Sequence, residues 1–261
     1  MNLPRIESLT FQISSDPHTR YEHPEQMAFA NALGQFQTGD GMLVWWPDED
    51  FFDIEEAKRA VASFLSDWEV HAAIQGMPEA LRFRFDHTEF EPLISRGPGE
   101  TVVLAAAAAF AVSAVASAIV IRKRYPAPPL DFHATTEVET AFRRWRAYLE
   151  GREPLLSMAY FVFTVLVPEN GRSRQEASAL FAIEETVLRT LSGLSSVRSG
   201  LDARKFTASN PVPLSDHERA WLEDAVRRLI YRLGEHAGGA ALTLIQMDDL
   251  PQPPPVVGPK K

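Results

Sequence analysis

The sequence predicts an α+β fold: an N-terminal antiparallel sheet that carries one amphipathic helix, followed by a C-terminal bundle of four or five helices. Three observations lead to this prediction. Apolar and polar residues alternate in several stretches of the first 130 positions, which is typical of strands. From about Thr135 the apolar residues recur at helical spacing instead. The prolines of the YPAPP block at 125–129 separate the two regions, because proline cannot continue a strand ladder.

Strands are expected where the sequence has a two-residue period. Stretches 9–13 and 81–85 alternate in this way. Stretches 35–38 and 42–46 flank Gly39-Asp40-Gly41, and an Asp-Gly pair between two strands favours a tight hairpin turn. These four stretches indicate antiparallel pairing in the first half.

One helix is expected between these strands. Asp53 and Glu56 have the spacing of a capping box, and Gly76 marks the predicted end. Between them, apolar residues from Ile54 to Ala72 recur every three or four positions. This pattern predicts that one face of the helix packs on the sheet.

The second half is predicted to be helical. Capping boxes at Thr136 with Glu139 and at Ser215 with Glu218 begin two helices, which end at Gly151 and Gly234. Stretch 155–166 is apolar on all sides, as in the buried centre of a bundle. Shorter helices are expected at 172–181 and 184–194, and a short strand at 242–247.

Three regions follow from these elements. Residues 1–130 form a strand-rich half, and residues 131–236 form a helical half that shares a core with the first. Residues 237–261 hold the short strand and a proline-rich tail, which we expect to be disordered from 251.

The apolar run 102–121 decides between a membrane protein and a soluble one. It holds twenty residues without a charge or a proline, and Arg122, Lys123 and Arg124 follow it. That length spans a bilayer, and a basic flank suits a cytoplasmic end. However, nine of the twenty residues are alanine, and the second half of the run alternates like a strand. We favour a buried β-hairpin or strand, with a single-pass membrane anchor as the alternative.

Composition narrows the classes of function. Cysteine is absent, which excludes disulfides and thiolate chemistry and suits the cytoplasm. The net charge of −9 argues against a surface dominated by phosphate contacts. The 14 glycines match neither a dinucleotide nor a P-loop pattern, and no serine stands in a hydrolase elbow. We therefore expect no cofactor and a protein that is not an enzyme.

Four blocks of the chain resemble an uncharacterised family of soluble bacterial proteins with no assigned activity. They are 55–72 (EEAKRAVASFLSDWEVHA), 125–129 (YPAPP), 151–166 (GREPLLSMAYFVFTVL) and 249–251 (DLP). Together they span about two hundred residues. The resemblance implies a strand in a soluble protein for the stretch before YPAPP, and it implies no site residue.

The strongest candidate for a nucleic-acid interface is the helix pair at 172–194. Its apolar residues have the spacing of two short helices packed across a tight turn, as in a helix-turn-helix. The candidate phosphate contacts are Arg172, Arg174, Arg189 and Arg198. Glu184 and Glu185 stand where a DNA reader approaches phosphates, and they would repel them. A DNA-binding regulator is therefore the alternative function.

A metal site is a third hypothesis. On a strand, His87, Glu89 and Glu91 would share one face, and an imidazole with two carboxylates suits a divalent cation. Only the fold could bring in His71 or His133 as a further ligand. The simpler interpretation is the polar end of a strand that runs into solvent, so a metal-dependent enzyme ranks below the other functions.

An aromatic cluster is the candidate for a protein-binding surface. It consists of Trp45, Trp46, Phe51 and Phe52, next to Asp48, Glu49, Asp50 and Asp53. Packing on the following helix is the default for these aromatics. If they are exposed, they would anchor a partner while the carboxylates steer its basic groups. The function we favour is a soluble cytoplasmic accessory or protein-interaction module whose partner is another protein.

Overall fold

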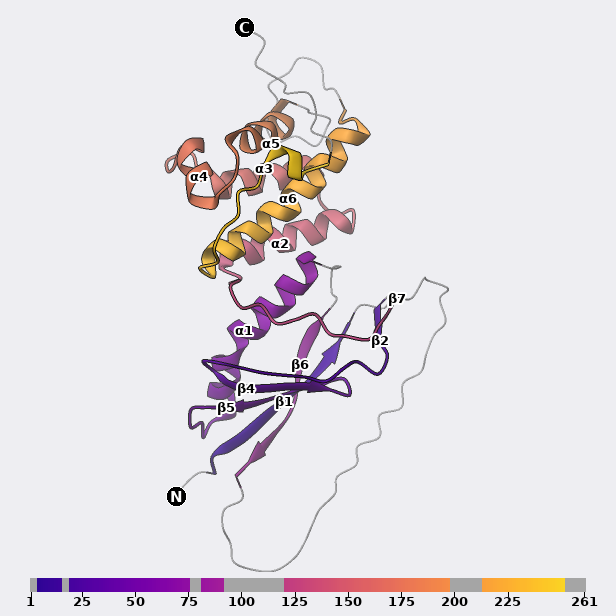
Figure 1. Ribbon diagram of the computed structural model, residues 1–261, viewed down its shortest axis with the longest axis vertical. Coiled ribbons are helices and arrows are strands. Elements are labelled where there is room, and N and C mark those ends of the chain that lie inside the picture. Colours follow the sequence, from indigo (N-terminus) through magenta and orange to yellow (C-terminus); the bar gives the residue numbers. More distant parts are fainter. Residues whose placement is uncertain (1–3, 16–18, 76–80, 92–119, 198–212, 252–261) are drawn as a thin grey trace, which may run out of the picture. The chain divides into compact units, whose positions relative to one another are not determined.

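In the computed structural model the chain folds as the predicted α+β protein, with strands first and helices after them (Figure 1). The structure describes residues 4–15, 19–75, 81–91, 120–197 and 213–251. The chain divides into a sheet unit, Met1–Leu65 with Glu79–Ala127, and a helical unit, Ser66–Pro78 with Pro128–Lys261. Each unit is therefore made from two separate stretches of chain.

The sheet unit contains a five-stranded sheet in the order β3-β4-β5-β1-β6, in which all neighbours are antiparallel. Its strands are β1 (Ile6–Ser14), β3 (Met27–Asn31), β4 (Gly34–Gly39), β5 (Met42–Pro47) and β6 (Arg82–Phe90). A parallel pair is formed by β2 (Thr19–Tyr21) and β7 (Val120–Arg122). The predicted hairpin joins β4 to β5. Asp40 and Gly41 both have positive φ, 49° and 80°, as a type I′ turn requires.

Helix α1 (Ile54–Gln75) begins at the predicted cap, where the Asp53 carboxylate accepts the Glu56 amide at 2.8 Å. Its first half packs on one face of the sheet. The ring of Phe64 lies 4.9 Å from that of Phe36, centroid to centroid, and the Lys58 amine lies 4.9 Å over the ring of Phe85. The apolar face of the helix therefore closes the core of the sheet unit.

The helical unit holds five further α-helices among the described residues. They are α2 (Thr136–Leu149), α3 (Leu155–Leu166), α4 (Arg174–Phe181), α5 (Glu185–Val197) and α6 (Asp216–Ala237). A short 3-10 turn, η1 (Met247–Asp249), follows. On α3, Met158, Ala159 and Val162 are fully buried. The most apolar helix therefore lies in the core, as its sequence predicts. The second half of α1 belongs to the same core through Val70, Ala73 and Ile74.

Two helix ends differ from their sequence prediction. The N-cap of α2 is Thr135, whose hydroxyl accepts the Val138 amide, so the cap at Thr136 was placed one residue late. Helix α6 continues past Gly234 to Ala237. Gly234 does not end the helix; it makes room for Phe132, because a β-carbon there would lie 2.0 Å from the Cε2 atom of that ring. The predicted capping box of Ser215 and Glu218 is confirmed.

The predicted strand at 242–247 was wrong. Only one isolated parallel bridge forms there, between Ile245 and Ile183. Ile245 is buried against the turn between α4 and α5, and its backbone bonds to Ala182 and Glu184, whereas Leu244 beside it is exposed.

Most of the apolar run, residues 102–119, lies outside the described residues, and so does the tail from 252. The last two residues of the apolar run, Val120 and Ile121, form β7 together with Arg122. Among the helices that the structure describes, none is both long enough and apolar enough to cross a bilayer.

Candidate functional site

The four aromatic residues of the predicted protein-binding cluster divide between core and surface. Trp45 and Phe51 are buried, Trp46 is half-buried, and Phe52 is 49% exposed. The rings of Trp45 and Phe51 lie 5.9 Å apart, and the Trp45 indole donates to the carbonyl of Leu33 at 3.0 Å. Phe52 is thus the only one of the four that offers a broad exposed ring.

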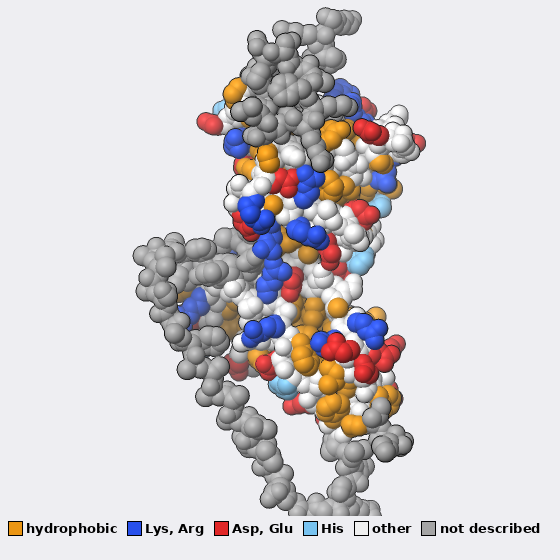
Figure 2. Space-filling model, turned by 180° about the vertical axis from the view of Figure 1, so that it is seen from behind, with side chains coloured by type: hydrophobic (Ala, Val, Ile, Leu, Met, Phe, Trp, Pro, Cys, Tyr) orange, Lys and Arg blue, Asp and Glu red, His pale blue; other side chains and the backbone are white. Residues whose placement is uncertain are grey.

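The surface of the sheet unit carries acidic and hydrophobic side chains next to one another (Figure 2). The exposed carboxylates of Asp48, Glu49, Asp50 and Asp53 belong to the segment that contains Phe52. One of them, Asp50, forms an ion pair with Arg5 at 2.7 Å. This segment is therefore an acidic rim with one exposed aromatic side chain, Phe52.

The three predicted metal ligands each have a different partner. The His87 imidazole lies 2.7 Å from the Asp86 carboxylate. Glu89 accepts a hydrogen bond from Ser8 at 3.1 Å, and Glu91 forms an ion pair with Arg5 at 3.0 Å. Within the part of the chain that the structure describes, no group of three or more such side chains has the geometry to hold a metal ion.

A bulge in β6 explains why these residues do not continue the buried face of the strand. On β1, Phe11 pairs with Phe85 but the preceding Thr10 pairs with His87, which leaves Asp86 as an extra residue. An extra residue reverses which side chains face the core. The two histidines considered as further ligands lie in the helical unit, His71 beside Tyr231 and His133 beside Asp67.

The arginines proposed as phosphate contacts are engaged within the protein. The Arg172 guanidinium lies 5.0 Å over the ring of Phe181, and that of Arg174 lies 5.9 Å over Phe163. Arg189 forms an ion pair with Glu185 one turn away, at 3.1 Å. Arg198 lies outside the described residues. Over the helical unit, basic side chains are mixed with acidic ones in the view of Figure 2.

Residues 245–249, here called the C-terminal strap, cover the turn between α4 and α5. Ala182 occupies the left-handed region in this turn, with φ 48°, and its carbonyl accepts the Ile245 amide at 2.9 Å. The Glu184 amide donates to the Ile245 carbonyl at 2.8 Å, and the Glu184 carboxylate accepts the Met247 amide at 2.9 Å. The N-terminus of α5 is thus already bonded to the chain itself.

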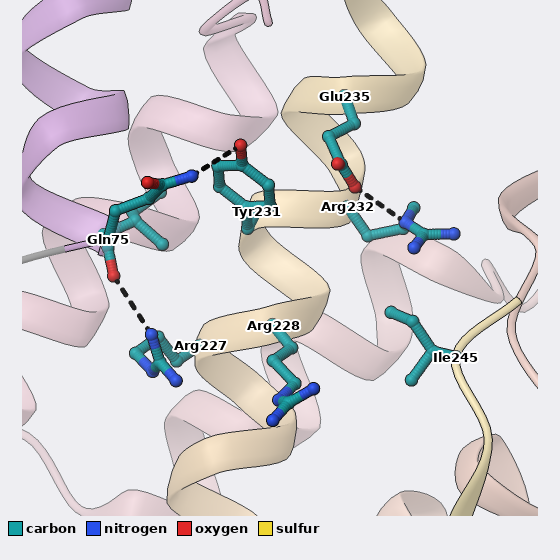
Figure 3. A pocket seen from close by; sticks show the side chains of 8 residues that line it. Gln75, Arg227, Arg228, Tyr231, Arg232, Glu235 and Ile245 are labelled. Atoms are coloured by element: carbon teal, nitrogen blue, oxygen red, sulfur yellow. Dashed lines mark hydrogen bonds and ion pairs between the residues drawn. The ribbon is translucent and has the colours of Figure 1, made fainter. Parts of the chain in front are cut away.

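A groove runs along the exposed face of α6, in the helical unit. Its floor is α6, and its walls come from the end of α1 and from the C-terminal strap (Figure 3). The volume is about 320 Å³. We call it the arginine groove, and it is lined by Ile74, Gln75, Arg227, Arg228, Tyr231, Arg232, Glu235 and Ile245.

Each arginine of the groove has an internal partner. Arg227 and Arg228 share one carboxylate, that of Asp224, each at 2.7 Å. Arg232 is buried, pairs with Glu235 at 2.9 Å and donates to the Phe181 carbonyl at 2.9 Å. Among the residues that the structure describes, three guanidiniums thus pair with two carboxylates, an excess of one positive charge.

Tyr231 lines the groove on the side of α1, where it contacts Gln75 and His71. Its hydroxyl oxygen accepts the Gln75 side-chain amide at 2.7 Å and lies 3.2 Å from Nε2 of His71. Burial raises the pKa of Tyr231, and Glu235 raises it further, so the phenol stays protonated near neutral pH. Burial also lowers the pKa of His71, which favours a neutral imidazole beside the phenol.

Sequence reasoning missed the arginine groove, although part of its pattern is visible. Arg227, Arg228 and Tyr231 have the spacing of one helical face, opposite the apolar stripe of α6, and Arg232 lies at the edge of that stripe. Periodicity alone does not show that Gln75 and Ile245 lie next to that face, because they are distant in the sequence.

No protein-family model matches this sequence, and neither a curated protein nor a solved structure is detectably similar to it. The site is therefore interpreted from its own geometry.

Proposed function

We propose that the chain is a non-catalytic accessory protein of the cytoplasm that binds another protein, and that the arginine groove is the surface that receives this partner. The observation that carries the proposal is the set of three arginines in the groove, which pair with only two carboxylates among the described residues. Uncompensated guanidinium charge at the surface favours an acidic partner, because charge complementarity steers and orients association.

The shape and composition of the groove support a polypeptide as the partner. Its floor extends from Arg227 to Glu235, a rise of about 12 Å along a helix. That length suits a short peptide segment better than a single small anion. Ile74 and Ile245 add only narrow apolar edges beside the arginines, since they are 3% and 8% exposed. Arginine is enriched at the cores of protein interfaces.

The ionisable groups of the groove support binding in preference to catalysis. A guanidinium stays protonated, so it binds anions and does not exchange protons. The raised pKa of Tyr231 keeps its phenol protonated as well. The Glu235 carboxylate is paired with Arg232.

The DNA-binding alternative has less support from the geometry. The turn that would present α5 to DNA is covered by the C-terminal strap, through Glu184. Arg189 is paired with Glu185, and the chain carries a net charge of −9. The membrane-anchor alternative depends on residues 102–119, and a carbonate wash of the membrane fraction tests it directly.

Site-specific photocrosslinking tests the proposed function. A photoreactive amino acid is placed at Arg228, in the groove, and in a matched control at Arg59, an exposed arginine of α1. We expect a partner protein that crosslinks from position 228 and not from position 59. The purified partner should then bind the wild-type chain, and Arg228→Glu should weaken that binding at least about tenfold while Arg59→Glu leaves it unchanged.

Two results would overturn the proposal. One is identical crosslinked species from positions 228 and 59. The other is a purified partner whose affinity is the same for the wild type and for Arg228→Glu.

A further inference from the structure

We propose that strand β3 is a dimerisation edge, through which two copies of this chain join their sheets into one continuous sheet. The five-stranded sheet has two edge strands, β3 and β6. Proteins protect such edges from further pairing with charged side chains, prolines or bulges. This surface is separate from the arginine groove, so the proposal does not depend on the proposed function.

The two edges of the sheet are protected to different degrees. Five of the nine residues of β6 are ionisable, namely Arg82, Arg84, Asp86, His87 and Glu89. The bulge at Asp86 interrupts the same strand. Strand β3 has the sequence Met-Ala-Phe-Ala-Asn, which contains neither an ionisable residue nor a proline. Its register with β4 is continuous along its whole length. The edge at β3 is therefore open to another strand.

The register of the sheet determines which backbone groups of β3 face outward. Gly39 and Met42 flank the two-residue turn Asp40-Gly41, so they form a hydrogen-bonded pair. Such pairs alternate along a ladder, so the odd-numbered residues of β4 bond to β5 and the even-numbered ones bond to β3. The partners of the even-numbered residues on β3 are Met27, Phe29 and Asn31. The N–H and C=O groups of Ala28 and Ala30 therefore point away from β4.

These outward groups have no strand to pair with inside the protein. Among the described residues, β4 is the only strand that neighbours β3. Ala28 and Ala30 are both exposed. Each alanine thus offers one donor and one acceptor along the free side of the sheet.

Strand β3 is complementary to a second copy of itself. In an antiparallel pairing centred on Phe29, Ala28 of each copy lies opposite Ala30 of the other, and their outward groups form hydrogen-bonded pairs. All five residues of β3 then have a partner. Like charges that lie directly opposite each other destabilise a pair of strands, and none are brought together here. A twofold axis uses the same surface on both copies, as in most homodimers.

Phe29 supplies an apolar contact at this twofold axis. Its ring is stacked on that of Phe36 at 5.0 Å and lies 6.0 Å from that of Phe64, yet the residue is only half-buried. In the proposed register Phe29 lies directly opposite Phe29 of the second copy, as a non-hydrogen-bonded pair, where side chains approach most closely. Aromatic pairs across two strands are favourable. Pairing therefore covers the exposed part of each ring.

Sedimentation equilibrium of the full-length chain tests the proposal. The average mass should rise from that of one chain toward that of two as the concentration increases from about 1 µM to about 500 µM, the range that suits a small interface. The net charge of −9 makes two copies repel each other. We therefore expect stronger association at about 300 mM salt than at about 50 mM, because salt screens this repulsion.

Two double variants test the register. Ala28→Lys with Ala30→Lys places lysine opposite lysine across the interface, and Ala28→Lys with Ala30→Glu places lysine opposite glutamate. The first should dissociate at least about tenfold more readily than the second, because directly opposed like charges repel and opposite charges attract. Gln35→Lys with Gln37→Lys is the matched control. These exposed residues of β4 lie beside Ala30 and Ala28, one strand away from the edge, and should have no effect. Urea unfolding verifies that each variant is folded.

Disulfide crosslinking tests the same register by an independent route, since the chain has no cysteine of its own. Hydrogen-bonded antiparallel pairs have Cα atoms about 5.5 Å apart, which a disulfide can bridge. A mixture of Ala28→Cys and Ala30→Cys chains should therefore crosslink on mild oxidation. Either variant alone places cysteine opposite alanine and should crosslink much less, as should the control Gln35→Cys.

Three outcomes would overturn this proposal. The first is a mass of one chain at every concentration and salt, which would leave the edge to a strand of another protein. The second is equal association of the two folded double variants. The third is crosslinking of Ala28→Cys alone as efficient as that of the mixture. The arginine groove takes no part in these measurements, so such results would leave the proposed function intact.

Discussion

Phe132 packs so closely on the backbone of Gly234 that a β-carbon at position 234 would lie 2.0 Å from Cε2 and 2.4 Å from Cζ of the ring. The same ring lies 5.5 Å from that of Tyr231 and 5.3 Å from that of His71, centroid to centroid. The absence of a side chain at Gly234 therefore lets the Phe132 ring pack beside Tyr231 and His71.

Gly234→Ala should destabilise the protein by about 1–3 kcal/mol, the usual cost of overpacking a core. Gly193→Ala is the control, because Gly193 is also helical and a β-carbon there meets nothing within 4 Å. That variant should stabilise the protein by about 0.5–1 kcal/mol, since alanine is the better helix former. Urea unfolding measures both. Equal effects of the two substitutions would show that helix propensity, and not the ring of Phe132, decides the outcome.

Ala182→Gly should stabilise the protein by about 0.5–1 kcal/mol. Ala182 is held at φ 48° and ψ 57°, a left-handed conformation that costs energy for any residue with a β-carbon. Ala179→Gly, at an exposed position inside α4, is the control and should destabilise by about 1 kcal/mol. Thermal or urea unfolding compares them. If Ala182→Gly also destabilises, the strain at this turn is too small to outweigh the added entropy of the unfolded chain.

Acidification should weaken the fold through His71. Burial holds the pKa of His71 below its ordinary value of 6.5, so in this window the unfolded chain binds a proton that the folded chain does not. The stability that comes from the neutral imidazole is therefore complete above pH 6.5 and is lost as the pH falls toward the lowered pKa. Unfolding curves between pH 7.5 and 5.5 should show this loss, and His71→Gln should reduce it. An NMR titration of His71 with a midpoint above 6.5 would contradict the assignment.

The wild-type chain should not bind duplex DNA at 50 mM salt, because the helix pair has no described arginine without an internal contact. Fluorescence anisotropy with a labelled 20-base-pair duplex measures this, with Arg189→Glu alongside. Salt-dependent binding that disappears in Arg189→Glu would instead support the DNA-binding regulator.

The local elements could be predicted because their signals lie within a few neighbouring residues. The Asp40-Gly41 turn, the cap at Asp53 and the capping box of Ser215 are found where the sequence places them. The edge strand β3 was missed, since Met27–Asn31 is short and alanine, not a polar residue, alternates with Met27 and Phe29.

The candidate site could not be predicted because it depends on tertiary contacts. Gln75 and Tyr231 are 156 positions apart in the sequence and meet at 2.7 Å. The bulge at Asp86 likewise changes the face of β6 on which His87 lies, relative to the face that strict alternation along the strand predicts. Both features arise from contacts between segments that are distant in the sequence. The periodicity of a single segment does not reveal such contacts.

The composition of the helical unit has a practical consequence for any attempt to divide this protein. Residues 66–78 belong to that unit although the sheet unit lies on both sides of them in the sequence. A gene fragment that begins at 128 would encode a bundle without Val70, Ala73 and Ile74 in its core, and with one wall of the groove missing. A fragment that ends before Ile245 would lose the opposite wall. A shortened or fused form of the protein should therefore keep the chain uninterrupted from the sheet unit through the C-terminal strap.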